Sequence, residues 1–330
     1  MNGAGRRILV FLAKLVVSTV LIGFVLYRID LDEIRAAAAN PNWFWLVGAL
    51  AIYGLSAVGG ALQWSWILRA AGIEASGHEI RRLYFIGLFF NNFLPANIGG
   101  DAYKIGDLGR RENRPQAVFC ATLLDRLVGL GALAFLAMIA YAGCTLAGIA
   151  LPRTALLLVP VLLLILAVVA FLLSRRIGSR LPALFRALKM ERLADQVAKI
   201  TAELVHFRHR TRWLAGIFAF SMGVQLLRML THLAVAAGLG FALSGSQSMQ
   251  LLVLIPLLAI SLTLPITING IGLRESVSAS LLTWAGIPES HAVAMEVAAF
   301  LVMVAISLQG GILLWLGGAK PKRVPEGGGN

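Results

Sequence analysis

Long, uninterrupted apolar stretches set the strongest limit on how this chain can fold. An α-helix needs about 20 apolar residues to cross the hydrocarbon core of a bilayer, because each residue adds only about 1.5 Å of length. Six stretches of the sequence are long and apolar enough: 8–27, 43–68, 116–142, 153–173, 213–240 and 291–317. The sequence therefore predicts an all-α integral membrane protein with six transmembrane helices.

The composition agrees with a membrane protein. Hydrophobic residues make up 58% of the chain and charged residues only 14%, whereas soluble domains carry about 25% charged residues. The formal net charge is +13, but the basic residues lie at the ends of the apolar stretches. That placement indicates contact with anionic lipid headgroups rather than with nucleic acid. Cys120 and Cys144 lack His or Cys partners at metal-ligand spacing, so we interpret them as small buried hydrophobic residues. We expect neither a metal nor a cofactor.

The distribution of Lys and Arg predicts how the chain is oriented. Basic residues precede the first stretch, follow the second and the sixth, and fill the segment 174–212, which holds ten. The loops 143–152 and 241–250 have none. Because basic loops stay in the cytoplasm, we expect a bacterial inner-membrane protein with both termini cytoplasmic. The segment 174–212 also predicts an amphipathic helix on anionic lipid, and the Gly-rich tail 321–330 is predicted to be disordered.

Two further apolar segments, 83–94 and 249–264, are too short to span a bilayer. Each ends in a Leu-Pro pair, Leu94-Pro95 and Leu264-Pro265, followed by glycines. We interpret both as re-entrant segments that enter the membrane, break, and return to the same side. A broken backbone at membrane depth is tolerated only where protein or a wet cavity satisfies its polar groups.

The two breaks predict an internal repeat. Leu, Pro, Ile and Gly recur at a constant offset of 170 between segments 94–100 and 264–270, and each break follows two predicted spans and precedes one. A unit of three spans must be inserted upside down when repeated, so the sequence predicts an inverted repeat with a substrate site near the midplane. Two unrelated Pro-Gly kinks are the alternative. The predicted organisation is one membrane domain over 1–330, with a first repeat at 8–142, a loop, fourth span and basic linker at 143–212, and a second repeat at 153–317.

Charged residues beside the two breaks are the best candidates for the site. Ionisable side chains at membrane depth are costly, so they are usually functional or paired. Arg, Lys and backbone N–H groups at helix starts can replace water around a phosphodiester headgroup. The predicted substrate-binding residues are Asn97, Gly99, Gly100, Asp101, Lys104, Asp125, Arg126, Asn269, Gly270, Arg274, Glu275 and Glu296.

Structural alternatives remain for some of these residues. Asp125-Arg126 could form an ion pair that locks two helices, and Arg274-Glu275 could be charges at a helix start. Arg228 and His232 lie four residues apart and share a helix face. We interpret them as an interior polar patch rather than a metal site.

Several of these motifs together resemble one family. Phe93-Leu94-Pro95, Gly99-Gly100-Asp101, Asp125-Arg126, Leu264-Pro265 and the segment 269–275 resemble the lysylphosphatidylglycerol synthase transmembrane-region family, over nearly the whole chain. The resemblance implies movement of a lipid between leaflets, with aminoacylated phosphatidylglycerol as the best-known cargo and other lipids for stand-alone members. The soluble aminoacyl-transferase domain of two-part members is absent from this sequence, so the resemblance implies no lipid aminoacylation.

The leading functional hypothesis is a lipid flippase that moves a phospholipid or lipid-linked headgroup through a midplane polar cavity. The alternatives are an intramembrane enzyme and a scaffold for lipid-synthesis enzymes. The sequence has no His-Glu-x-x-His, Gly-x-Ser-x-Gly or P-loop motif, and we expect the protein not to be an enzyme. Membrane lipids with an anionic or otherwise charged headgroup are the expected partners, and a homo-oligomer is compatible with the sequence.

Overall fold

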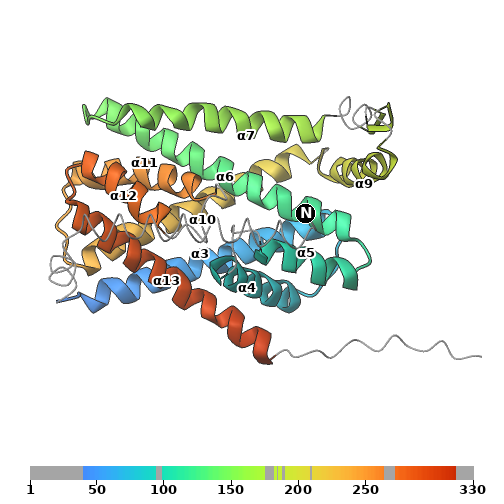
Figure 1. Ribbon diagram of the computed structural model, residues 1–330, viewed down its shortest axis with the longest axis horizontal. Coiled ribbons are helices and arrows are strands. Elements are labelled where there is room, and N and C mark those ends of the chain that lie inside the picture. Colours follow the sequence, from blue (N-terminus) through green and yellow to red (C-terminus); the bar gives the residue numbers. More distant parts are fainter. Residues whose placement is uncertain are drawn as a thin grey trace, which may run out of the picture.

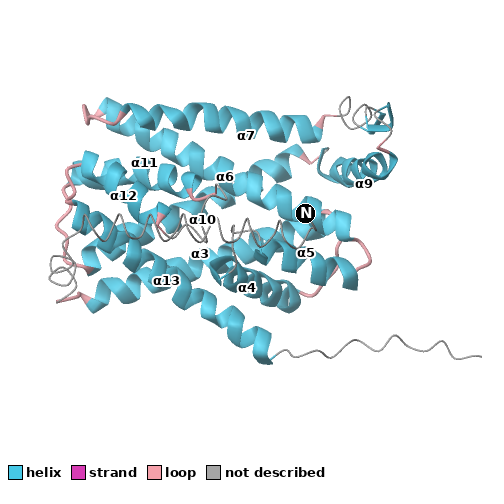
Figure 2. Cartoon of the chain, viewed as in Figure 1, coloured by secondary structure: helices cyan, strands magenta, loops and turns pink. Residues whose placement is uncertain are grey.

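The computed structural model describes residues 40–93, 99–174, 182–183, 185–187, 190–208, 210–263 and 272–316. Within these ranges the protein is helical and has no strand, which confirms the all-α prediction (Figure 2). The elements are α3 Trp43–Ala70, α4 Gly77–Phe93, α5 Gly99–Arg111, α6 Pro115–Leu146, the 3-10 helix η2 Arg153–Leu157, α7 Leu158–Leu173, α9 Glu191–Arg208, α10 Thr211–Gly238, α11 Gly245–Ser261, α12 Leu273–Trp284 and α13 Glu289–Leu316.

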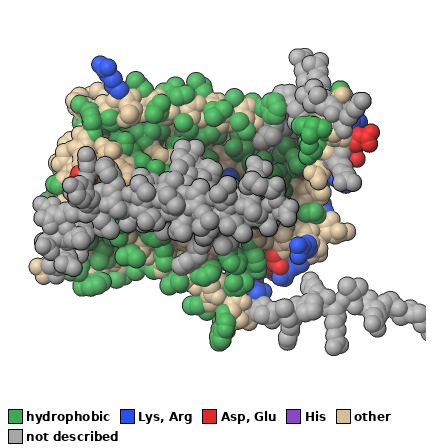
Figure 3. Space-filling model, viewed as in Figure 1, with side chains coloured by type: hydrophobic (Ala, Val, Ile, Leu, Met, Phe, Trp, Pro, Cys, Tyr) green, Lys and Arg blue, Asp and Glu red, His purple; other side chains and the backbone are tan. Residues whose placement is uncertain are grey.

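Five helical segments in the described ranges are long and apolar enough to cross a membrane. They are Trp43–Ala70, Pro115–Leu146, Arg153–Phe171, Arg212–Gly238 and Glu289–Leu316. Each matches one of the predicted spans, while the stretch 8–27 and the tail 321–330 lie outside the described residues. Figure 3 shows hydrophobic side chains over much of the visible body of the molecule. Apolar surface of this extent suits lipid better than water, and the protein is a multi-pass membrane protein.

The two short apolar segments form helices that stop before the breaks. Residues 83–93 lie in α4, and residues 249–261 lie in α11, which begins at a capping box formed by Ser244 and Gln247. The breaks themselves, 94–98 and 264–271, lie outside the described residues, and α5 and α12 follow them. Figure 1 shows α4 and α5 toward one end of the molecule and α11 and α12 toward the other. Re-entry into the membrane therefore stays a prediction.

The order of helices is the same in the two parts of the chain. A long helix, two short helices and a long helix make up α3–α6, called here the first half, and α10–α13, called the second half. The halves interlock: α3 packs against α10, α4 against α13, and α11 against α6. Superposition of the halves about a two-fold axis stays a prediction.

Two glycines bring α4 into backbone contact with its neighbours. A Cβ atom at Gly100 would collide with the carbonyl group of Gly87, so the start of α5 touches α4. A Cβ atom at Gly310 would collide with the backbone of Phe85, so α13 touches α4 on another side. The side chain of Asn91 also accepts a hydrogen bond of 2.9 Å from the Gly100 N–H. Helix α4 is therefore held between α5 and α13.

The basic segment 174–212 contains α9, which docks on the protein. Ala194, Leu204 and Phe207 of α9 are buried, and α9 packs against α6 and α7. Glu203 of α9 accepts a hydrogen bond of 2.8 Å from Arg114, just before α6. One face of α9 thus packs on helices, and contact of another face with lipid stays a prediction.

Candidate functional site

A cavity of about 380 Å³ lies between the two halves. Its walls come from α3, α4, α5 and α6 of the first half and from α10, α11, α12 and α13 of the second. Although these helices are mostly apolar, the walls carry charged side chains and a histidine: Asp101, Lys104, Asp125, Arg126, Arg228, His232, Arg274 and Glu296. Because such residues are rarely placed at membrane depth without a role, this cavity is the candidate site.

The first group of charges, called here the Asp101 cluster, joins Asp101, Lys104 and Arg126. Arg126 Nε of α6 donates a hydrogen bond of 2.6 Å to Asp101 Oδ2, and Lys104 Nζ lies 2.8 Å from Oδ1. Lys104 also lies over the rings of Trp64 and Tyr84, 4.8 Å and 5.3 Å from their centroids. The Lys104 side chain is only 6% exposed, whereas that of Arg126 is 40% exposed. Asp101 thus contacts one buried cation, Lys104, and one partly exposed cation, Arg126.

Asp125 has a different partner from its neighbour Arg126. Asp125 Oδ1 accepts a hydrogen bond of 2.8 Å from Gln63 Nε2 of α3. Arg126 instead pairs with Asp101 of α5. The two residues both line the cavity and both link α6 to another helix, so the structure is compatible with a structural role and with a cargo role.

The second group, called here the Glu296 cluster, joins Glu296, His232 and Arg274. Glu296 of α13 is fully buried, with His232 Nε2 of α10 at 3.3 Å and Arg274 Nη1 of α12 at 3.5 Å from its two oxygens. The guanidinium of Arg274 also lies 5.1 Å from the ring centroid of Phe300. A carboxylate again contacts two nitrogen-bearing side chains, but here no member is more than 13% exposed.

His232 lies between a backbone carbonyl group and the Glu296 carboxyl group. Its Nδ1 is 3.1 Å from the carbonyl oxygen of Arg228, and its Nε2 is 3.3 Å from Glu296 Oε1. Each ring nitrogen therefore faces an oxygen atom of another residue, and these two contacts fix the orientation of the ring.

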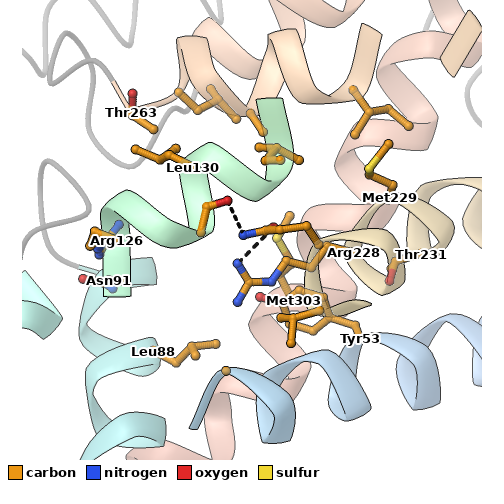
Figure 4. A pocket seen from close by; sticks show the side chains of 18 of the residues that line it. Tyr53, Leu88, Asn91, Arg126, Leu130, Arg228, Met229, Thr231, Thr263 and Met303 are labelled. Carbon is orange, nitrogen blue, oxygen red and sulfur yellow. Dashed lines mark hydrogen bonds between the residues drawn. The ribbon is translucent and has the colours of Figure 1, made fainter. Parts of the chain in front are cut away.

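Arg228 of α10 also lines the cavity. In Figure 4 it extends into the space between α6, which carries Leu130, and α3, which carries Tyr53. Arg228 Nη1 is 3.5 Å from Gln225 Oε1, and Gln225 Nε2 donates a 3.0 Å hydrogen bond to the Gly129 carbonyl of α6 (Figure 4). The buried Nε of Arg228 has no hydrogen-bond partner in the described part of the chain.

The structure brings six of the predicted site residues together. Asp101, Lys104, Asp125, Arg126, Arg274 and Glu296 line the cavity. Gly99 and Gly100 form the start of α5 beside it, and Glu275 accepts a 2.7 Å hydrogen bond from the Gly272 N–H, which caps α12 as the alternative for this residue anticipated. Asn97, Asn269 and Gly270 lie outside the described residues.

Sequence reasoning left Arg228 and His232 out of the predicted site. It placed them on one interior helix face, and the structure puts that face on the cavity. Tyr53 and Tyr84, which also line the cavity, were not anticipated. A charged pair inside a predicted span was the only available signal, since the spacing says which residues share a face but not what that face meets.

Fold and site together define a class: a multi-pass membrane protein with a charged cavity between two similarly ordered sets of helices. Residues 11–310 match the family described as the lysylphosphatidylglycerol synthase TM region. Because the match covers most of the chain, the protein belongs to this family, as the resemblance of its motifs implied.

Two archaeal relatives are similar to the chain. A UPF0104 membrane protein of Pyrococcus horikoshii is 23% identical over 321 residues, which covers 91% of this chain and 95% of the relative. A UPF0104 membrane protein of Methanocaldococcus jannaschii is 28% identical over 116 residues, about a third of either chain (34% of each). No solved structure matches the chain.

Proposed function

We propose that the protein moves a lipid between the two leaflets of a membrane, with the headgroup passing through the charged cavity. The observation that carries this proposal is the wall of ionisable side chains drawn from both halves of the molecule. Membership of a family named for a lipid synthase's membrane region supports a lipid as the cargo. The proposed location is a bacterial inner membrane, with both termini in the cytoplasm.

The physical argument concerns the cost of moving a headgroup through hydrocarbon. A charged group at the bilayer centre costs about 3 kcal/mol or more unless it is hydrated or paired. Arg126, whose side chain is 40% exposed, can leave Asp101 for a lipid phosphate, while Asp101 keeps Lys104 as its partner. The acyl chains need no such substitute, because the outer faces of the helices and the lipid around them are equally apolar.

A leaflet-resolved transport assay tests the proposal. The purified protein is placed in liposomes with a fluorescent phosphatidylglycerol, and the fraction of label reached by an impermeant quencher is followed over time. We expect the native protein to speed the exchange of label between leaflets and Arg126→Gln to slow it by about tenfold or more, the scale of one lost charge-assisted contact. Arg110, which is exposed at the end of α5, provides the matched control Arg110→Gln, which keeps native exchange.

Three results would count against the proposal or one of its parts. Exchange no faster than in protein-free liposomes, for a protein with a native thermal midpoint, removes lipid movement as its function and leaves a lipid-acting enzyme or a scaffold. Native exchange in Arg126→Gln removes Arg126 from the path. Labelling of a cysteine placed at residue 246 only from the cytoplasmic side would overturn the proposed orientation.

A further inference from the structure

Arg228 differs from the other cations in the cavity by the absence of a carboxylate. Lys104 and Arg126 both contact Asp101, and Arg274 contacts Glu296. Among the residues that the structure describes, no carboxylate oxygen lies within 4.0 Å of a nitrogen atom of the Arg228 guanidinium, the limit for an ion pair. The cavity therefore holds one guanidinium that its own acidic side chains do not pair.

The side chains in direct contact with the Arg228 guanidinium are polar but uncharged. Its Nη1 reaches Gln225 only at 3.5 Å. A Cβ atom at Gly60 would lie 3.5 Å from Arg228 Nη2 and would clash with the Tyr84 hydroxyl, so the hydroxyl and the guanidinium share the space that this glycine leaves. Amide and phenol groups soften the cost of burying the cation, but they do not neutralise it. An anion that enters the cavity would neutralise the charge of the guanidinium.

The charges of the described lining residues point in the same direction. Among them the cationic side chains are Lys104, Arg126, Arg228 and Arg274, and the carboxylates are Asp101, Asp125 and Glu296, so with neutral histidine their formal balance is 4 − 3 = +1. The cavity thus favours a guest with negative charge, and repels one that brings additional positive charge.

We propose that Arg228 binds the phosphate of an anionic phosphodiester headgroup, and that the excess positive charge selects anionic over zwitterionic lipids. The proposal rests on the proposed function and names the class of its cargo. The planar guanidinium offers two parallel N–H groups that match two phosphate oxygens. Tyr53 and Tyr84 line the cavity with it and add hydroxyl donors that leave the positive charge intact.

Lipid binding, measured separately from transport, tests the proposal. Native mass spectrometry of the full chain in detergent compares phosphatidylglycerol, which is anionic, with phosphatidylcholine, which is zwitterionic. We expect the native protein to bind phosphatidylglycerol about tenfold or more tightly than phosphatidylcholine, and Arg228→Gln to lose most of that preference, the scale of one charge-assisted bidentate contact. Arg228→Lys, which keeps the charge without the planar fork, should retain part of it, and Arg110→Gln all of it.

A stability measurement separates this role from a structural one. Because none of the described carboxylates lies within 4.0 Å of Arg228, Arg228→Gln breaks no ion pair, and its thermal midpoint should stay within about 3 °C of the native value. A native preference for phosphatidylglycerol in Arg228→Gln overturns the proposal. A large fall in the midpoint of both Arg228→Gln and Arg228→Lys also overturns it, because Arg228 would then be needed for folding.

A soluble phosphate distinguishes a lipid headgroup from a free anion. Glycerol phosphate should compete with phosphatidylglycerol only at far higher concentration, since it lacks the acyl chains. Competition at equal concentration would assign the site to a soluble phosphate and overturn the lipid proposal. If lipid preference depends on Arg228 but the liposome assay shows no exchange, the anion site stands and the proposed transport fails.

Discussion

The Asp101 cluster and the Glu296 cluster are built alike but lie in different surroundings. Each places one carboxylate against two nitrogen bases, and each joins more than one helix. In the Asp101 cluster the contacts are 2.6 Å and 2.8 Å and Arg126 is 40% exposed. In the Glu296 cluster the contacts are 3.3 Å and 3.5 Å, and the exposed fractions are 13%, 12% and 0%.

The difference in exposure between the two clusters predicts different roles for them. An ion pair with an exposed member can exchange its partner for a ligand or water at small cost, because solvent screens the separated charges. A pair whose members are all buried cannot separate without leaving a charge in a medium of low polarity. We therefore expect the Asp101 cluster to take part in cargo exchange and the Glu296 cluster to hold α10, α12 and α13 together.

The largest expected effect is the loss of Arg274. Arg274→Gln leaves the fully buried Glu296 with His232 alone, and removing one partner of a buried ion pair costs about 3–5 kcal/mol. Unfolding of purified protein in mixed micelles with a denaturing detergent measures the free energy. If Arg274→Gln stays within about 1 kcal/mol of native, the Glu296 cluster is no more tightly coupled than a surface pair.

A double substitution sharpens the same test. Arg274→Gln combined with Glu296→Gln removes the uncompensated carboxylate, so part of the lost stability should return. Additive losses in the double variant would show that the two side chains act independently, against the 3.5 Å contact between them.

A smaller effect is expected from a methyl group beside the Asp101 cluster. At Gly100 it would press on the Gly87 carbonyl, and overpacking of this kind costs about 1–3 kcal/mol. Gly100→Ala should also displace the neighbouring Asp101 and slow lipid exchange. Gly106→Ala in the same helix is the matched control, because nothing lies within 4 Å of the added atom. Equal stability of the two variants in micelle unfolding would contradict the close contact between α4 and α5.

The smallest effect on stability is expected for Arg126. Its pair with Asp101, in which the Arg126 side chain is 40% exposed, should contribute about 1 kcal/mol or less, although the proposed lipid exchange depends on it. Arg126→Gln should therefore unfold in micelles almost like the native protein. If Arg126→Gln lost as much free energy of unfolding as Arg274→Gln, the Asp101 cluster would be as tightly coupled as the Glu296 cluster, and the proposed difference between them would be wrong.

Apolar length predicted much of the fold, because it depends only on local composition. The predicted span 43–68 corresponds to α3 Trp43–Ala70, and 116–142 corresponds to α6 Pro115–Leu146. The positions of Asp101 and Arg274 on the cavity also followed from the sequence, since each comes directly after a Pro-Gly break in an apolar segment.

Which side chains on different helices contact one another could not be predicted from the sequence. Asp125 and Arg126 are adjacent in the sequence, yet Asp125 binds Gln63 and Arg126 binds Asp101. Successive residues on a helix point about 100° apart, so adjacent charges need not meet one another. The role of Glu275 was open for a related reason: a carboxylate three residues after Gly272 can cap a helix or face a cavity, and only the geometry shows the 2.7 Å contact with the Gly272 N–H.

The backbone contacts of α4 constrain how the molecule can change shape. Gly100 and Gly310 bring the backbones of α5 and α13 against α4. At those two points no side chains lie between the helices that could rearrange to let one helix move against another. Rotation of one against another would have to open a gap or force a clash. We therefore expect α4, α5 and α13 to move as one rigid unit, although they come from both halves. If the cavity opens alternately to the two sides of the membrane, the hinges should lie outside these three helices.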